Sequence, residues 1–231
     1  MKKLFTYFIV LIGLFGFAQN PFITIHSFIL QNNFNQARLV LDSCQTKNYF
    51  TDSVYFYRGL SAIKEGKTEV CREFCARLTK EFSQFYEVHY LKGLLFFQKQ
   101  NFGKSADEFT RLLKYNPKDI KALFNRSVAL GSMEDYLDAI NDLNTCIEIN
   151  SNYADAYYSR AYWYEYTGNY MEATKDYQTS IKLNPKNYDA YFGLAFIYQT
   201  LKDSTKACET INKAILAGSQ IAEEVKDSFC R

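Results

Sequence analysis

A period of about 34 residues constrains this chain more than any other feature, because it holds register from position 25 to position 211 without a gap. Three columns of the repeat stay almost entirely small or apolar. One column holds Ala37, Cys71, Ser105, Ala139, Ala173 and Ala207, and the column four positions on holds Leu41, Cys75, Phe109, Leu143, Tyr177 and Ile211. Twelve positions before the first column lie Ile25, Gly59, Gly93, Ser127, Ala161 and Ala195. A repeat of this length is one supersecondary unit, and stacked neighbours bury a continuous core.

Each repeat predicts two helices joined by a tight turn. In residues 154–187, apolar or small residues recur at helical spacing at Tyr157, Ala161 and Tyr164, and Thr167-Gly168-Asn169 then ends the first helix. The chain has only three prolines and ten glycines, too few for a sandwich or barrel rich in turns. Small columns let two helices cross closely. The pattern therefore predicts an all-α chain of helix–turn–helix units.

These residues closely resemble a known family. Ala161, Gly168-Asn169-Tyr170, Ala173 and Asn184-Pro185 are similar to the signature of the tetratricopeptide repeat. Residues 52–85, 86–119, 120–153 and 188–221 resemble the same unit, 19–51 resemble a degenerate first unit interrupted by Pro21, and 222–231 a short capping helix. The resemblance implies a right-handed α-solenoid whose first helices line a concave groove. It says little about the identity of the bound partner.

The N-terminus has the three-part pattern of a secretory signal peptide. Lys2 and Lys3 precede an apolar run at positions 4–17, and Ala18 completes a small-residue cleavage site. An uncleaved membrane anchor is the alternative, but a spanning helix needs about 20 apolar residues, more than this run provides. We therefore expect residues 1–18 to be removed and the mature chain, without stable membrane insertion, to be periplasmic or extracellular.

The charge balance argues against nucleic acid as a partner. The chain has 27 Lys and Arg against 25 Asp and Glu, and loss of the two N-terminal lysines leaves 25 of each. A neutral chain lacks the basic surface that neutralises phosphates.

A column of basic residues runs through the repeats, with acidic residues sixteen positions later. The predicted pairs are Lys92–Glu108, Arg126–Asp142 and Arg160–Asp176. Leu194 and Thr210 replace both members of the pair in the last repeat, whereas Arg58 faces Phe74 in this register. The alternative is an anion-binding track, but loss of both partners together favours ion pairs within each unit, because buried charges are usually paired.

Six cysteines in an exported chain raise the question of disulfides. Cys208 and Cys230 form the candidate pair, since the last repeat helix and the cap should run antiparallel. Cys71 and Cys75 lie one helical turn apart, a spacing that also suits a metal, but only Cys44 and His89 could complete four ligands. We predict no metal site, and the pairing of Cys44, Cys71 and Cys75 stays open.

No catalytic motif stands out. The two histidines, His26 and His89, occupy different repeat columns, and the chain contains no Gly-rich phosphate loop and no HExxH zinc motif. We therefore predict a protein that is not an enzyme and needs no cofactor.

An aromatic column is the candidate binding feature. The family resemblance places Phe56, Tyr90, Phe124, Tyr158 and Phe192 toward the concave groove, with Leu94, Tyr162, Tyr166 and Phe196 beside them. Packing between helices is the alternative role for these rings. The family's carboxylate clamp for chaperone tails uses Lys and Asn at such positions, so that specificity is not implied here.

The predicted function is an exported adaptor that binds a protein or peptide segment in the groove. The alternative is a structural subunit of a cell-envelope assembly that uses its edges or convex face. An enzyme and an aromatic glycan binder rank below both, and the oligomeric state is not predicted.

Overall fold

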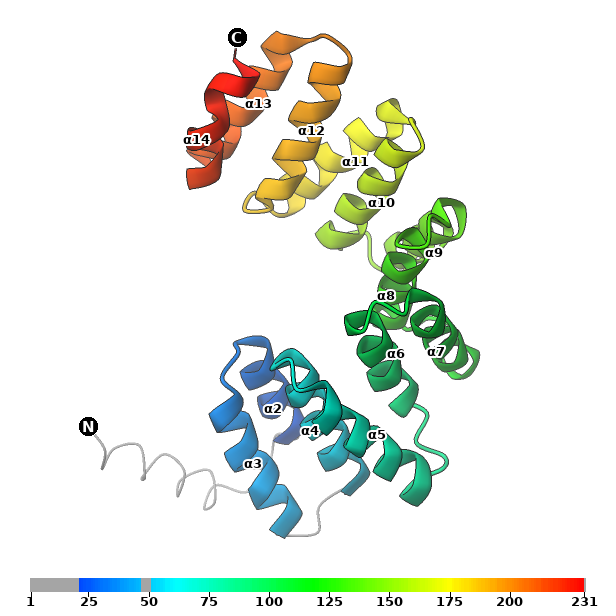
Figure 1. Cartoon of the computed structure of the whole chain (residues 1–231). Coiled ribbons are helices and arrows are strands. Elements are labelled where there is room, and N and C mark those ends of the chain that lie inside the picture. The colour runs from blue at the N-terminus through cyan, green and yellow to red at the C-terminus, as the bar shows by residue number, and fades with distance from the viewer. Residues whose placement is uncertain (1–20, 47–50, 231) are drawn as a thin grey trace, which may run out of the picture. The chain divides into compact units, whose positions relative to one another are not determined.

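The computed structural model describes residues 21–46 and 51–230, all of whose regular elements are helices (Figure 1). The predicted signal peptide, residues 1–18, lies outside the described residues. The all-α fold predicted from the repeat is confirmed. Among the helices described, none is both long and apolar enough to cross a membrane.

The chain divides into two compact units, with the boundary after Gln98. The first contains α2 (Pro21–Leu30), α3 (Phe34–Thr46), α4 (Thr51–Lys64), α5 (Thr68–Glu81) and α6 (Val88–Gln98). The second contains α7 (Phe102–Tyr115), α8 (Ile120–Gly131), α9 (Tyr136–Ile149), α10 (Ala154–Tyr166), α11 (Tyr170–Leu183), α12 (Tyr188–Thr200), α13 (Ser204–Leu216) and α14 (Gln220–Phe229).

The repeat columns form the core of each unit. In the described repeats every residue of the column from Ala37 to Ala207 is fully buried, and the column from Leu41 to Ile211 is at most 3% exposed. These positions lie where the second helix of one repeat crosses its neighbours, so only a small side chain fits the first column. The repeat period is therefore the spacing of successive core layers.

Two layers of helices can be distinguished within the second unit. The first helices of successive repeats contact one another, since α10 packs against both α8 and α12. The second helices, α9, α11 and α13, mainly contact the first helices beside them. A stack that is crowded in one layer and splayed in the other curves toward the crowded layer. We call the surface of α8, α10 and α12 the inner face, and the side of α7, α9, α11 and α13 the outer face.

Turn chemistry sets the helix boundaries. Gly168 and Gly218 have φ values of 75° and 99°, which favour glycine after a helix. Side chains of Asp119 and Ser219 accept hydrogen bonds from backbone N–H groups at the starts of α8 and α14, at 3.0 and 3.2 Å. Because Ser219 caps it, the final helix begins at Gln220, two positions before the predicted start at 222.

Candidate functional site

Two arginines of the second unit lie in ion pairs between the paired helices of their repeats. Arg126 on α8 donates through Nε and Nη2 to the Asp142 carboxylate at 2.8 and 2.6 Å. Arg160 on α10 does the same to Asp176, at 2.6 and 2.8 Å. Both aspartate side chains are 8% exposed. Such bidentate pairs satisfy a buried charge and fix the angle between two helices.

Each guanidinium also reaches back to the preceding repeat, a contact that the sequence pattern did not reveal. Arg126 Nη1 donates to the Thr110 hydroxyl at 3.1 Å, and Arg160 Nη1 to Asn144 Oδ1 at 2.7 Å. Thr110 and Asn144 lie sixteen positions before their arginines. Each arginine therefore joins two successive second helices as well as its own hairpin.

The earlier members of the basic column differ. Arg58 donates to Asp42 and Gln45 on the preceding helix, so its acidic partner lies sixteen positions before it instead of after it. Lys92 and Glu108 belong to separately described units, and their pairing stays a prediction. Within its own unit Glu108 accepts a hydrogen bond from Arg111 at 3.0 Å.

The aromatic column is half-buried where it was predicted to line a groove. Phe56, Tyr90 and Leu94 pack against the core of the first unit. In the second unit Phe124 lies 5.4 Å from the Tyr153 ring, and Phe192 packs on the last core cluster. These side chains contribute to folding, and only part of each ring is available to a partner.

The most accessible rings of the inner face lie about two turns beyond Tyr158 on α10 and about one turn beyond Phe192 on α12. Tyr166 is 56% exposed and Phe196 is 52% exposed. Tyr166 and Tyr162 share a hydrogen bond of 3.1 Å between their hydroxyls, which, together with burial, raises the pKa of Tyr162 to about 12. The Tyr162 ring lies 6.4 Å from that of Tyr158. A ladder of tyrosines therefore runs along α10 from half-buried to exposed.

A half-buried carboxylate stands beside this ladder. The Tyr177 hydroxyl donates to Glu165 Oε2 at 2.8 Å, yet burial raises the pKa of Glu165 more than this hydrogen bond lowers it. Burial also raises the pKa of Tyr158, and the negative charges of Asp189 and Glu165 raise it further. The inner face around Tyr158 is therefore both aromatic and negatively charged.

The C-terminal cap is tied to the last repeat. A disulfide joins Cys208 on α13 to Cys230 at the end of α14, with Cα atoms 4.6 Å apart. The Gln199 side chain donates to the Ser228 carbonyl at 2.9 Å, a second link to the cap. The remaining cysteines are buried thiols within the helix interfaces, namely Cys44, Cys71, Cys75 and Cys146. The described residues contain no group of three or more potential metal ligands.

Three protein-family models match parts of this chain. A model described as "TPR repeat" matches residues 164–202, and two described as "Tetratricopeptide repeat" match residues 188–217 and 90–144. The protein is a tetratricopeptide repeat (TPR) protein.

Solved TPR structures share this fold. MamA from Desulfovibrio magneticus RS-1 is 18% identical, with a TM-score of 0.65, over 73% of this chain and 95% of that one. TTC0263 from Thermus thermophilus is 15% identical, with a TM-score of 0.61, over 77% and 98% of the two chains. YrrB, described as "a TPR protein with an unusual peptide-binding site", is 19% identical, with a TM-score of 0.61, over 75% and 91%. At these identities the likeness shows the fold.

Three side-chain features of this TPR protein distinguish its inner face. The exposed rings Tyr166 and Phe196 give a partner apolar contact area. The hydroxyls of Tyr162 and Tyr166 supply hydrogen-bonding groups at the surface. Glu165 contributes negative charge at the same helix. Together these groups suit recognition of a chain with apolar and basic side chains, and no nucleophile–base pair accompanies them in the described interactions.

Proposed function

We propose that this protein is an exported, non-catalytic TPR adaptor that binds a protein or peptide segment on the inner face of its second unit. The observation that carries the proposal is the exposure of Tyr166 and Phe196, at 56% and 52%, beside the half-buried rings of Tyr158 and Phe192. Large rings that remain half accessible on one layer of helices are typical anchors for a partner.

The charges beside these rings favour a basic segment. Asp189 and Glu165 act electrostatically on Tyr158, so an Arg or Lys of the partner would meet both a ring face and a carboxylate. The chain as a whole is close to neutral, and long-range attraction is therefore weak. Affinity would come mainly from apolar contacts, with the carboxylates selecting basic side chains at close range.

The family supports this class of function. TPR proteins include YrrB, whose description states a peptide-binding site. The carboxylate clamp of other TPR domains uses Lys and Asn at groove positions where this chain has aromatic or aliphatic residues. The partner is therefore not predicted to be a chaperone tail. Extended or helical segments laid across successive helices suit a surface with one anchor position per repeat.

The test begins with a partner isolated by crosslinking to the mature chain and then compares purified variants. Tyr166→Ala and Phe196→Ala should each weaken binding about tenfold or more if the rings are hot spots. Both side chains are more than half exposed, so the variants should stay folded, although Tyr166→Ala also removes contacts with the Tyr136 and Tyr162 rings. Matched controls are Leu137→Ala and Met171→Ala on the second helices, where the side chains are 75% and 67% exposed. The controls should retain affinity within about twofold.

Full affinity in both inner-face variants, with loss in the outer controls, would favour the structural subunit of an envelope assembly instead.

Export has its own test. N-terminal sequencing of the protein produced in its native host should find Gln19 first, and a chain that retains Met1 would remove the exported part of the proposal.

A further inference from the structure

A guanidinium group occupies the same place on the outer side of two successive repeats. Arg160 reaches from α10 into the space between α9 and α11, where it bonds Asn144 and Asp176. Its Cζ lies 5.6 Å from the ring centre of Tyr157 and 5.9 Å from that of Tyr164. Arg126 bridges α7 and α9 in the same way. Because second helices are splayed, this arginine fills the space that remains between them.

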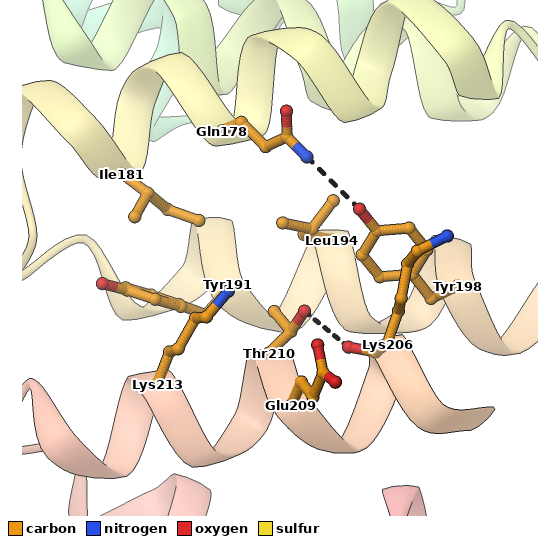
Figure 2. Close-up of a pocket in the computed structure, with 9 residues that line it drawn as sticks. All are labelled: Gln178, Ile181, Tyr191, Leu194, Tyr198, Lys206, Glu209, Thr210 and Lys213. Carbon is orange, nitrogen blue, oxygen red and sulfur yellow. Dashed lines mark hydrogen bonds between the residues drawn. The ribbon is translucent and has the colours of Figure 1, made fainter. Parts of the chain in front are cut away.

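The last repeat lacks the arginine and has a cavity in its place. Leu194, one full repeat after Arg160, is the corresponding side chain of α12. A cavity of about 370 Å³ lies there between α11, α12 and α13, and Leu194 is part of its wall (Figure 2). A leucine is too short to bridge the second helices as arginine does. The cavity therefore lies at the repeat position that Arg126 and Arg160 occupy in the preceding repeats.

The residues that bind the arginine in the preceding repeats are replaced in the last repeat, and their replacements form hydrogen bonds with other groups. Gln178 corresponds to Asn144, and its amide donates to the Tyr198 hydroxyl at 3.2 Å (Figure 2). Thr210 corresponds to Asp176, and its hydroxyl donates to the carbonyl of its own helix at Lys206, at 2.7 Å. Neither interaction crosses between α11 and α13.

Both aromatic walls of the arginine site are retained. Tyr191 and Tyr198, one full repeat after Tyr157 and Tyr164, line the cavity. Tyr198 already attracts a cation, because Lys206 Nζ lies 5.5 Å from its ring centre. The two rings are thus retained in the last repeat, and at Tyr198 the chain's own Lys206 takes the place of the guanidinium. Aromatic faces bind cations through the electrostatic field of the ring.

The charged residues that line the cavity are Lys206, Glu209 and Lys213. Lys206 pairs with Asp203 at 2.8 Å, and Glu209 and Lys213 contribute one further charge of each sign. Glu209 stands where the preceding repeat has Lys175, so a carboxylate has been gained beside the position where Asp176 has become Thr210. A cation entering the cavity therefore has an acidic partner within reach.

We propose that this cavity binds the side chain of an arginine from a partner protein. The guanidinium would lie over Tyr191 and Tyr198, as that of Arg160 lies over Tyr157 and Tyr164, and would displace Lys206 from the Tyr198 ring. Glu209 would be its carboxylate. The buried wall of Leu194 would contact the aliphatic stem. This site lies in the outer layer and is independent of the inner-face binding proposed above. It gives the last repeat a second point of attachment, specific for one side chain.

The test is an NMR titration of the mature, disulfide-bonded chain with N-acetyl-arginine N-methylamide. The matched lysine, leucine and glutamate compounds serve as comparison probes. The arginine probe should bind with a Kd in the millimolar range expected for a single side chain, and shift the amide signals of Leu194, Glu209 and Thr210. The lysine and leucine probes should bind at least about threefold more weakly, since neither offers a planar cation.

Three variants decide the chemistry of the site. Glu209→Gln should weaken arginine binding about fivefold, as expected for a rim ion pair, whereas Lys213→Gln should leave it unchanged or strengthen it. The double variant Leu194→Arg/Thr210→Asp restores the pair of the preceding repeats and should abolish binding, because the chain's own guanidinium then fills the cavity. Circular dichroism and thermal unfolding would confirm that each variant is folded.

Several outcomes would overturn the proposal. No binding at about 50 mM arginine probe, far above a millimolar Kd, would do so. Preferential binding of the glutamate probe, with the effects of Glu209→Gln and Lys213→Gln reversed, would assign the cavity to a carboxylate instead. Preferential binding of the leucine probe would make it an apolar pocket. Unchanged arginine binding in the double variant would place the binding elsewhere on the protein.

Discussion

Gly193 and Tyr177 lie so close that no side chain fits at position 193. A Cβ added to Gly193 would lie 2.6 Å from the Tyr177 hydroxyl oxygen and closer still to the ring. Tyr177 is 1% exposed, and its hydroxyl reaches Glu165 at 2.8 Å. The missing side chain on α12 therefore allows a large ring of α11 to be buried and to hold a carboxylate of α10.

The first prediction follows from this packing. Gly193→Ala should destabilise the protein by about 1–3 kcal/mol, because overpacking outweighs the gain in helix propensity. Gly103→Ala is the matched control, since the nearest atoms to its added Cβ are 3.8 Å away on Met133. The control should be neutral or slightly stabilising. Chemical denaturation of both variants measures the difference in the free energy of unfolding. Equal values would show that Tyr177 can move away from the added Cβ without loss of stability.

The second prediction concerns pH. Burial raises the folded-state pKa of Glu165 above its ordinary value of 4.5, so its protonated form is favoured by folding. The corresponding stabilisation is full below 4.5 and is lost as the pH rises through the folded-state pKa. Glu165→Gln keeps an acceptor for Tyr177 without the charge. The variant should be more stable than the parent at neutral pH and lose this advantage in mild acid, near the ordinary pKa of a glutamate. Thermal unfolding across this range tests it, and a constant difference would contradict the assignment.

The third prediction addresses the ion pair between Arg160 and Asp176. Asp176→Thr alone leaves a guanidinium without its carboxylate and should cost about 2–4 kcal/mol. Adding Arg160→Leu reproduces the natural pair Leu194 and Thr210 of the last repeat and should recover part of this loss. A double-mutant cycle by denaturant unfolding gives the coupling energy. Additive effects would mean that the two residues act independently.

The fourth prediction concerns the cap. Cys208 and Cys230 have a sequence separation of 22, and in the chain-entropy model a loop of this length contributes about 3 kcal/mol. Substituting both with Ser should lower the stability of α14 first, because the disulfide holds the last helix. Hydrogen exchange of the α14 amides, compared with those of α10, measures this local effect. Equal protection of α14 in the parent and the variant would show that packing alone retains the cap.

The period alone was enough to predict the all-α architecture and the buried columns. A repeated pattern shows which positions must be small or apolar, because equivalent positions pack in the same way in every repeat. Pairs sixteen positions apart, such as Arg160 and Asp176, could be proposed because both lie within one hairpin, whose geometry the turn sets.

Only the tertiary structure decided which neighbour each side chain meets across repeats. The backward bonds to Thr110 and Asn144, and the shift of the Arg58 partner to Asp42, depend on how one hairpin stacks on the preceding one. The same stacking leaves Phe192 half-buried and Phe196 exposed, although both were predicted to line the groove. It also leaves a cavity beside Leu194, the counterpart of Arg160, because a shorter side chain leaves space only where the surrounding helices are held apart.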